Sequence, residues 1–151
     1  MSAYVDVDDY FKSTIAKDVA ALLLGKFLGY GSSRSIFEHA TDDSLIVKVE
    51  PEAKSFHNIS EWQVWERVKR MKVSRWFAPV VDISPNGAVL VMKRCEPARL
   101  GELPARVPAF FTDLKAENWG LFEGRFVCLD YGNHLLFEHG ITKRMRKVDW
   151  T

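Results

Sequence analysis

The sequence predicts an α+β fold, and three observations support this prediction. The chain has 151 residues, a length that fits one domain of ordinary size. Its composition is 47% hydrophobic and 13% aromatic, which is enough for a packed core and argues against a disordered chain. Helical patterns alternate with short apolar runs in the order helix, three strands, helix and two strands.

The first half of the chain accounts for most of these elements. Residues 7–24 carry apolar side chains at helical spacing, and Gly25 is expected to end this first helix. The runs "KFLGYG", "RSIFEHA" and "SLIVKVE" are separated by glycine, serine and "TDD", which is typical of an antiparallel meander. A second helix is expected over residues 58–71. The runs "APVVDIS" and "AVLVMKRC" around the turn at residues 85–87 then indicate a hairpin.

The second half is less regular. Three prolines between residues 96 and 109 exclude a long helix there. Residues 110–133, "FFTDLKAENWGLFEGRFVCLDYGN", contain a polar loop, an apolar run that resembles short strands, and a second polar loop. A weakly helical tail is expected to follow. Its basic residues are expected to form the solvated end of a helix: Lys143, Arg144, Arg146 and Lys147.

Charge and composition exclude several classes of function. Lys and Arg total 21 against 20 Asp and Glu, so no broad field favours nucleic acid or an anionic membrane. Cys95 and Cys128 lie in apolar runs, as buried thiols of a reducing compartment do, and the four histidines lack the spacing of a zinc site. Residues 19–25 are too short to span a bilayer, and the acidic start differs from a signal peptide. We therefore expect a cytoplasmic protein.

Three features of the first half are consistent with phosphate binding. Gly29 and Gly31 could let the backbone close over phosphate groups, although most such glycine turns are only turns. Lys48 lies in an apolar strand, where it either faces solvent or points inward and needs an anion. Glu61 could supply that anion because it lies beside the apolar stripe of the second helix, whereas Glu66 lies on the polar face.

Residues 110–133 offer the groups that phosphoryl transfer requires. This reaction needs metal ions, a lysine and an acid near the attacking hydroxyl. Asp113 could orient or deprotonate that hydroxyl, and Lys115 could neutralise the moving phosphoryl group. Asn118 and Asp130 could bind two magnesium ions through oxygen. A polar surface turn would explain any one of these residues but not the group.

These motifs occur in the order, and near the spacing, of the eukaryotic-type protein kinases, and the chain resembles that family in its serine/threonine form. Gly29, Gly31 and Ile36 match the glycine-rich loop and the apolar residue that follows it. Lys48 matches the lysine of the third strand, and Glu61 matches the glutamate of the next helix.

Further matches lie along the chain. "LVMKRCEP" resembles the strand and hinge against which adenine sits, with Met92 at the gatekeeper position and Cys95 offering backbone hydrogen bonds. "TDLKAEN" resembles the catalytic loop, and "DYG" resembles the Asp-Phe-Gly metal motif through Asp130. The resemblance implies ATP and Mg²⁺ as cofactors and transfer of the γ-phosphate to a protein hydroxyl.

The resemblance also implies an architecture for a single minimal domain over residues 1–151. Residues 26–97 would form the nucleotide-binding lobe and hinge, with a five-stranded antiparallel sheet and one helix. Residues 98–151 would form a much reduced second lobe, because only 19 residues follow Gly132 and leave no room for an activation segment. So small a kinase is expected of a compact genome such as a bacteriophage's, and it would then act in the host cytoplasm.

Some positions depart from the family. Arg34 replaces the third loop glycine, and Ile46 replaces an alanine, so its bulk could narrow the adenine pocket. Phe111 and Thr112 replace the histidine and arginine before the catalytic aspartate, which argues against regulation by an activation-loop phosphate.

Three functions therefore remain open. The first is an active kinase acting on a protein that supplies the docking surface. The second is a pseudokinase-like protein that binds and inhibits a partner. The third is a small-molecule kinase, which fits Lys115 less well. The aromatic residues of the short second lobe would have to pack locally or against another chain, so a homodimer is a further expectation: Phe110, Phe111, Trp119, Phe122 and Phe137.

Overall fold

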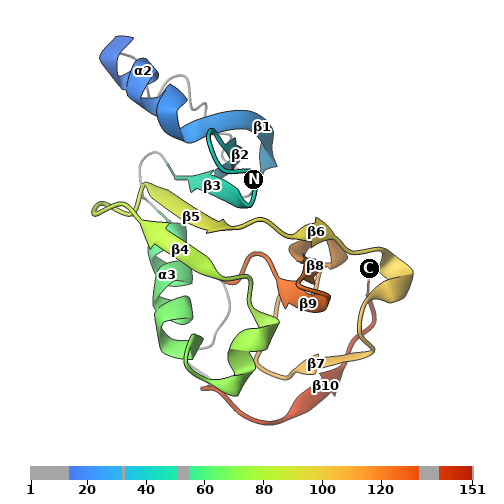
Figure 1. The fold of residues 1–151 in the computed structure, drawn as a ribbon. Coiled ribbons are helices and arrows are strands. Elements are labelled where there is room, and N and C mark those ends of the chain that lie inside the picture. Colours follow the sequence, from blue (N-terminus) through green and yellow to red (C-terminus); the bar gives the residue numbers. More distant parts are fainter. Residues whose placement is uncertain (1–13, 32, 51–54, 133–139, 151) are drawn as a thin grey trace. The chain divides into compact units, whose positions relative to one another are not determined.

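The computed structural model describes residues 14–31, 33–50, 55–132 and 140–150, which form two compact units (Figure 1). The first unit contains the described residues up to Ile59 together with Val80–Arg94. The second contains Ser60–Pro79 and the described residues from Cys95 onward. The predicted lobes divide the chain once, after residue 97, whereas in the structure the chain enters the second unit twice.

A five-stranded antiparallel sheet forms most of the first unit, as the sequence predicts. Its strand order is β1-β2-β3-β5-β4, so the meander of the first three strands is joined to the hairpin of the last two by pairing of β3 with β5. The strands are β1 (Leu24–Tyr30), β2 (Ser35–His39), β3 (Leu45–Val49), β4 (Val80–Ile83) and β5 (Val89–Lys93). Val47 and Val49 of the central strand and Leu90 of β5 are fully buried.

The hairpin between β4 and β5 turns at the predicted residues. Gly87 has a φ of 76°, a left-handed conformation that glycine adopts without a steric cost. Its N–H donates to Ser84 O at 2.9 Å, and Asn86 Oδ1 accepts from Ala88 N at 3.0 Å. The turn chemistry therefore fixes the register of this hairpin.

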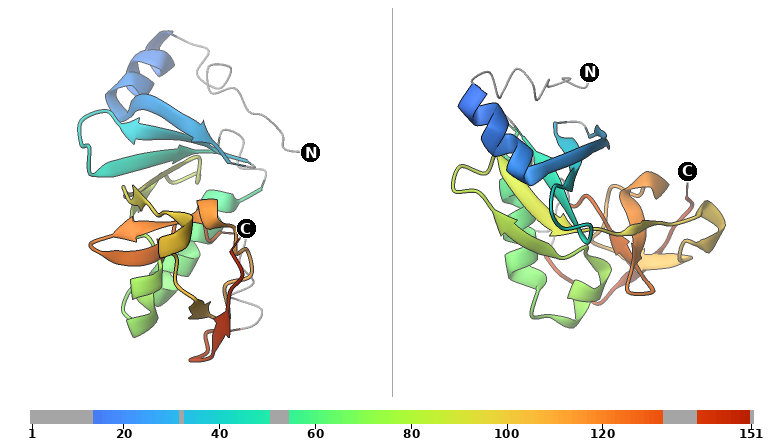
Figure 2. Two further views of the ribbon diagram at one scale, coloured as in Figure 1. Left: turned by 90° about the vertical axis from the view of Figure 1, so that its right-hand side faces the viewer. Right: turned by 45° about the horizontal axis from the view of Figure 1, so that its top comes forward.

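The first helix, α2 (Thr14–Leu23), lies within the predicted range and runs directly into β1 (Figure 2). The predicted residues 7–13 lie outside the described part of the chain. Gly25 does not end the helix, because β1 begins at Leu24 and Gly25 belongs to the strand. A Cβ at Gly25 would lie 3.0 Å from Glu38 O of the neighbouring strand, so close approach of two backbones explains this glycine.

The second helix, α3 (His57–Val68), is confirmed but ends before the predicted Met71. Its N-terminus is capped by the buried carboxylate of Glu50, which accepts from His57 N at 3.2 Å and Asn58 N at 2.8 Å. The 3-10 helix η1 (Lys72–Trp76) follows α3. Val64 and Val68 form the buried stripe of the helix.

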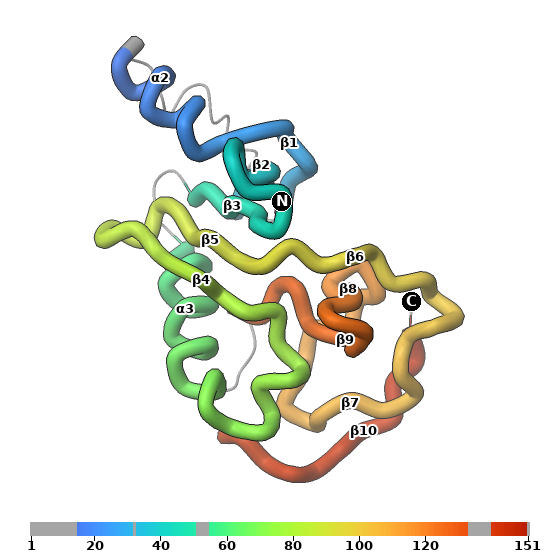
Figure 3. Tube along the Cα trace, in the orientation of Figure 1, coloured from blue at the N-terminus to red at the C-terminus, as the bar shows by residue number. Residues whose placement is uncertain are grey.

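The second unit contains two small sheets (Figure 3). The strands of the first are β6 (Glu96–Pro97), β8 (Trp119–Phe122) and β9 (Arg125–Cys128), in the order β6-β8-β9. The other pairs β7 (Arg106–Pro108) with β10 (Met145–Lys147). The 3-10 helices η2 (Leu100–Glu102) and η3 (Ala116–Asn118) precede β7 and β8, so no long helix occurs between residues 96 and 109.

The predicted helical tail is wrong at residues 145–147, which form β10. Met145 pairs with Pro108, and Lys147 pairs with Arg106. The basic tail residues are exposed, as expected, but Arg146 and Lys147 lie on a strand rather than at the end of a helix. Long-range pairing with β7 overrides a weak local preference for helix.

Aromatic side chains form the core of the second unit. Phe111 is fully buried and contacts Phe77 and Trp119, with ring centroids 5.1 and 5.0 Å apart. Phe77 also packs edge-on against Tyr131 at 4.9 Å. The expected local packing is thus present for Phe110, Phe111 and Trp119, whereas Phe137 lies outside the described residues.

Two composition-based expectations can be compared with the structure. Cys128 is buried, as expected, whereas Cys95 is half-buried, and the two are not joined in a disulfide. Over the described residues, no helix has both the length and the apolar character needed to cross a bilayer.

Candidate functional site

The predicted site residues fall into two groups, one in each unit. The first unit holds the residues expected to contact nucleotide, and the second holds those expected to bind metal and to act on the hydroxyl. Two of the residues expected to contact nucleotide are exceptions, because they belong to the second unit. They are Glu61 and Cys95, the residue at which the chain enters that unit for the second time.

Three predicted residues form a row across the sheet of the first unit. Gly29 of β1 pairs with Ile36 of β2, and Ile36 pairs with Lys48 of β3. Directly paired residues of an antiparallel sheet present their side chains on the same face. Lys48 is only 2% exposed, so the inward-pointing alternative holds and the solvent-facing one does not.

Two further residues share this face. Ile46 lies two positions before Lys48 on β3 and pairs with Met92 of β5. Met92 is 1% exposed and Ile46 is half-buried. The larger side chain at position 46 therefore lies beside Met92, at the place where the kinase resemblance puts an alanine.

The two loop glycines are not explained by the fold of the first unit. A Cβ at Gly29 would have no described atom within 4 Å, and one at Gly31 would lie 3.8 Å from Arg34 O. Neither residue is among the described glycines with a positive φ. Gly31 N donates to Arg34 O at 2.8 Å and so closes the turn between β1 and β2. Open space above the backbone is the property that glycine supplies here.

A buried polar network lies behind this turn, and sequence reasoning missed it. Arg34 is 4% exposed, and its Nη1 donates to Asn58 Oδ1 at 3.0 Å. Asn58 is fully buried, and its Nδ2 lies 2.9 Å from Gly87 O and 3.2 Å from both Lys48 O and Ala88 O. In the sequence, this network is indicated only by Arg34, which stands where the kinase resemblance places a glycine.

In the second unit, two residues of the predicted catalytic loop are hydrogen-bonded to each other. Asn118 Nδ2 donates to Asp113 Oδ2 at 3.1 Å, across the turn that contains η3. The same turn is joined to the strand before Asp130, because Leu129 N donates to Asn118 O at 2.7 Å. Asp113, Asn118 and Asp130 are each half-buried. The predicted "TDLKAEN" and "DYG" motifs therefore lie side by side.

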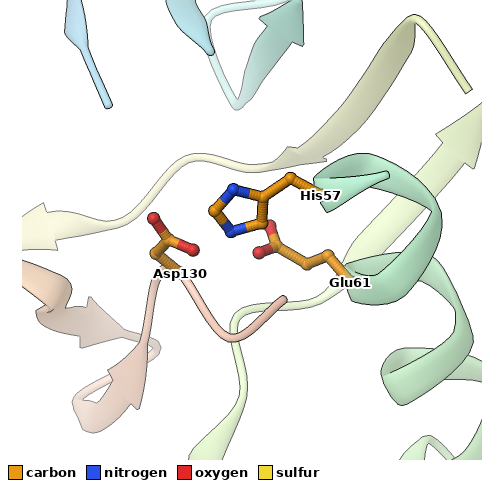
Figure 4. A group of neighbouring side chains, drawn as sticks. All are labelled: His57, Glu61 and Asp130. Carbon is orange, nitrogen blue, oxygen red and sulfur yellow. The ribbon is translucent and has the colours of Figure 1, made fainter. Parts of the chain in front are cut away.

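Glu61 is the buried acid of α3 and holds the second of these motifs. It is fully buried, and its Oε2 accepts from Tyr131 N at 3.0 Å and Gly132 N at 3.1 Å. A carboxylate oxygen of Glu61 lies within 4.8 Å of one of Asp130 (Figure 4). Glu66 is exposed and pairs with Lys69 at 2.7 Å. The sequence preference for Glu61 over Glu66 as the inward acid is confirmed.

The third side chain in Figure 4 is His57, one helical turn before Glu61. His57 belongs to the first unit, is buried, and its Nδ1 lies 2.9 Å from Ser33 Oγ. This histidine therefore connects the start of α3 to the turn that follows Gly31.

Two predicted residues of the second unit occupy less confined positions. Lys115 is exposed, and its carbonyl accepts from Asn118 N at 3.0 Å, which shapes the turn. Cys95 is half-buried in the connection between β5 and β6, as a hinge residue would be. Phe111 and Thr112 stand where the kinase resemblance places a histidine and an arginine. Phe111 is part of the aromatic core, and Thr112 is exposed.

The oxygen-rich donor set of the second unit fits magnesium. Mg²⁺ prefers carboxylate and carbonyl oxygens. The NH₂ group of Asn118 is directed to Asp113, so its Oδ1 is the atom available to a cation. Asp130 supplies a carboxylate close to that of Glu61, and two such acids are more stable together when a cation neutralises them. Asn118 and Asp130 would hold the metal, if one binds here.

No family model matches the chain, and no curated protein matches it. Solved structures similar to the chain include a ternary complex of streptomycin, ATP and APH(2″)-IIa, which matches 65% of this chain with 18% identity and a TM-score of 0.42. This chain covers 31% of that structure, or about a third of its length.

Proposed function

We propose that the chain is an ATP-dependent phosphotransferase of the protein kinase type, which transfers the γ-phosphate of ATP to a protein hydroxyl. The observation that carries this proposal is the hydrogen-bonded group of Asp113 and Asn118 beside Asp130, which Glu61 holds through the backbone of the next two residues. This group combines a base for a hydroxyl with oxygen ligands for magnesium.

Each residue of the group has a distinct role in the proposed reaction. Asp113 accepts the proton of the attacking hydroxyl, and its hydrogen bond from Asn118 orients the carboxylate. The hydroxyl oxygen forms a bond to the γ-phosphorus while the bond from that phosphorus to the bridging oxygen of ATP breaks, so ADP leaves. Magnesium, when bound, neutralises charge on the phosphate oxygens. Asn118 and Asp130 are its proposed ligands.

Nucleotide binding is assigned to the first unit. Gly29 and Gly31 leave open space above the turn for phosphate groups, and Lys48 supplies a positive charge on the same sheet face as Ile36. Met92 is the proposed apolar contact of adenine, and Ile46 is paired with it across the sheet. Lys115 of the second unit would neutralise the transferred phosphoryl group.

The proposal is tested by transfer of label from γ-labelled ATP to protein in a cell extract, with and without magnesium. Asp130→Asn and Asp113→Asn should each lower the rate about a hundredfold or more, because each removes a group that acts directly on the reacting atoms. Asp149→Asn makes the same chemical change at an exposed carboxylate of the same unit and should leave the rate unchanged.

Two results would contradict the proposal. The first is label transfer that persists in Asp130→Asn, since the proposed metal ligand would then be dispensable. The second is absence of transfer from a folded protein that also fails to bind ATP with magnesium. Folding of each variant is checked by the cooperativity of its urea transition.

A second candidate function is a binding protein that uses the fold without catalysis. The pairing of Ile46 with Met92 favours it, because a side chain larger than alanine beside the proposed adenine contact would reduce the space for nucleotide. In that case a partner would bind equally well to the wild type and Asp130→Asn, with or without magnesium. Label transfer that requires Asp130 would exclude this second candidate.

A further inference from the structure

A surface pocket in the second unit lies apart from the residues assigned to catalysis. It has a volume of about 340 Å³ and is lined by Arg75 and Trp76 of η1 and by Arg125 and Phe126 of β9. This volume falls within the range of pockets that take small ligands or inserted side chains. We call these four residues the arginine pocket.

Both guanidinium groups are held in place by their surroundings. Arg75 Cζ lies 5.2 Å from the centre of the Trp76 ring, and Arg125 Cζ lies 5.1 Å from that of Phe122. Arg125 Nε also donates to Arg75 O at 3.2 Å. A guanidinium that is already ordered loses less entropy when it binds a carboxylate, so the pocket is preorganised for an anion.

The pocket adjoins a basic segment of the chain. Residues 67–75, "RVKRMKVSR", contain five basic residues and no acidic one, although the whole chain has a net charge of only +1. All five are exposed. Such a local field attracts acidic partners and repels basic ones.

We propose that the arginine pocket binds an acidic segment of a partner protein, with an apolar side chain inserted beside a carboxylate. Trp76 and Phe126 supply the apolar wall, and the two arginines supply charge-assisted hydrogen bonds to the carboxylate. This site is separate from the group around Asp113 and requires no catalysis, so it can be tested whether or not the chain transfers phosphate.

The pocket favours an acidic peptide over a nucleic acid. Bases bind proteins by stacking on open aromatic faces. Here the Arg75 guanidinium covers a face of Trp76, and Trp76 also packs against Trp119 at 76° with centroids 6.3 Å apart. A pocket of this volume, lined by only four residues, has room for a side chain rather than for a run of stacked bases.

The experiment selects ligands from a yeast-displayed library of random peptides, with the full chain as bait. Enriched peptides should pair Asp or Glu with an adjacent apolar residue. Their affinity for Arg75→Glu should be about tenfold or more below that for the wild type, because a charge-assisted hydrogen bond is replaced by repulsion. Lys72→Glu makes the same change of net charge within η1, but Lys72 does not line the pocket. This variant should lower the peptide affinity about threefold or less.

Glu123 provides a change in the opposite direction. It is exposed and its Oε2 lies 3.3 Å from Arg125 Nη1, where it competes with an incoming carboxylate. Glu123→Gln should therefore raise the affinity of the selected acidic peptides. If the pocket residues were needed only for folding, Glu123→Gln would not raise the affinity for these peptides.

Four results would overturn the proposal. They are the absence of any enriched peptide, enrichment without acidic residues, equal losses in Arg75→Glu and Lys72→Glu, and tighter binding of single-stranded oligothymidylate than of the best peptide. The last result would assign the basic segment to nucleic acid instead. The urea transitions of all three variants should match the wild type, because Arg75, Lys72 and Glu123 are exposed.

Discussion

The side-chain amide of Asn118 donates a hydrogen bond of 3.1 Å to Asp113 Oδ2, and this contact joins two predicted site residues five positions apart. It fixes which end of the amide faces Asp113 and leaves the amide oxygen for a cation. A single hydrogen bond thus links orientation of the proposed base to binding of the proposed metal.

Replacing Asn118 should impair transfer without unfolding the protein. In Asn118→Ala, Asp113 loses its orienting donor and the proposed magnesium site loses a ligand, so the rate of phosphate transfer should fall about a hundredfold. The rate is measured with γ-labelled ATP over a series of magnesium concentrations. Gln63→Ala removes an exposed amide from α3 as a control. A normal rate in Asn118→Ala would remove Asn118 from the site.

Glu61 should contribute much more to stability than Glu66 of the same helix. Glu61→Gln replaces a buried carboxylate that accepts two backbone N–H groups, and should lower the free energy of unfolding by about 1–3 kcal/mol. Glu66→Gln breaks only the exposed pair with Lys69, which is worth about 0.5 kcal/mol or less. Urea denaturation measures both changes. Equal losses in the two variants would contradict the role of Glu61.

The side chain of Arg34 should stabilise the loop between β1 and β2, although this residue stands where kinases have the third loop glycine. Arg34→Gly makes the loop more like that of a kinase, but it removes the buried hydrogen bond to Asn58 and should cost about 1–3 kcal/mol of stability. Arg34→Met keeps an apolar stem and loses only the guanidinium, so it should cost a similar amount. The urea midpoints of both variants measure these losses of stability. An Arg34→Gly variant more stable than the wild type would contradict a stabilising role of Arg34.

Gly29 should matter for nucleotide and not for folding. A Cβ at this position meets no described atom within 4 Å, so Gly29→Ala should leave the unfolding free energy unchanged or raise it by up to about 1 kcal/mol. Its ATP affinity, measured by calorimetry with magnesium, should nevertheless fall, because the methyl group occupies the proposed approach of phosphate. Gly101→Ala, also at an open position, should leave ATP affinity unaltered.

Two turn glycines should differ in their tolerance of alanine. Gly124 has a φ of 75° and open space around it, so Gly124→Ala should cost about 1–2 kcal/mol from backbone conformation alone. Gly87 has a φ of 76°, and a Cβ there would lie 2.5 Å from Ile59 Cγ1. Gly87→Ala should therefore be the less stable variant in thermal unfolding, and the reverse order would contradict the packing around Ile59.

Local patterns in the sequence were sufficient for most secondary structure. The five strands of the first unit, the hairpin turn at Gly87 and the position of α3 follow from apolar periodicity and turn residues, which act over a few neighbouring residues. The inward position of Glu61 follows from its place beside the apolar stripe. The residues of the candidate site, including Asp113, Asn118 and Asp130, could also be selected from their type and their order in the sequence.

Long-range contacts decided the rest. Arg146 and Lys147 lie on a strand because β7, about forty positions earlier, offers hydrogen-bonding partners, and no local pattern reveals such a partner. The burial of Lys48 and Arg34, the hydrogen bonds from Tyr131 and Gly132 to Glu61 and the arginine pocket all require segments that meet only when the chain folds. The sequence by itself determined which groups the protein carries, and the tertiary structure decided which of them share a site, because proximity in space depends on packing between distant segments.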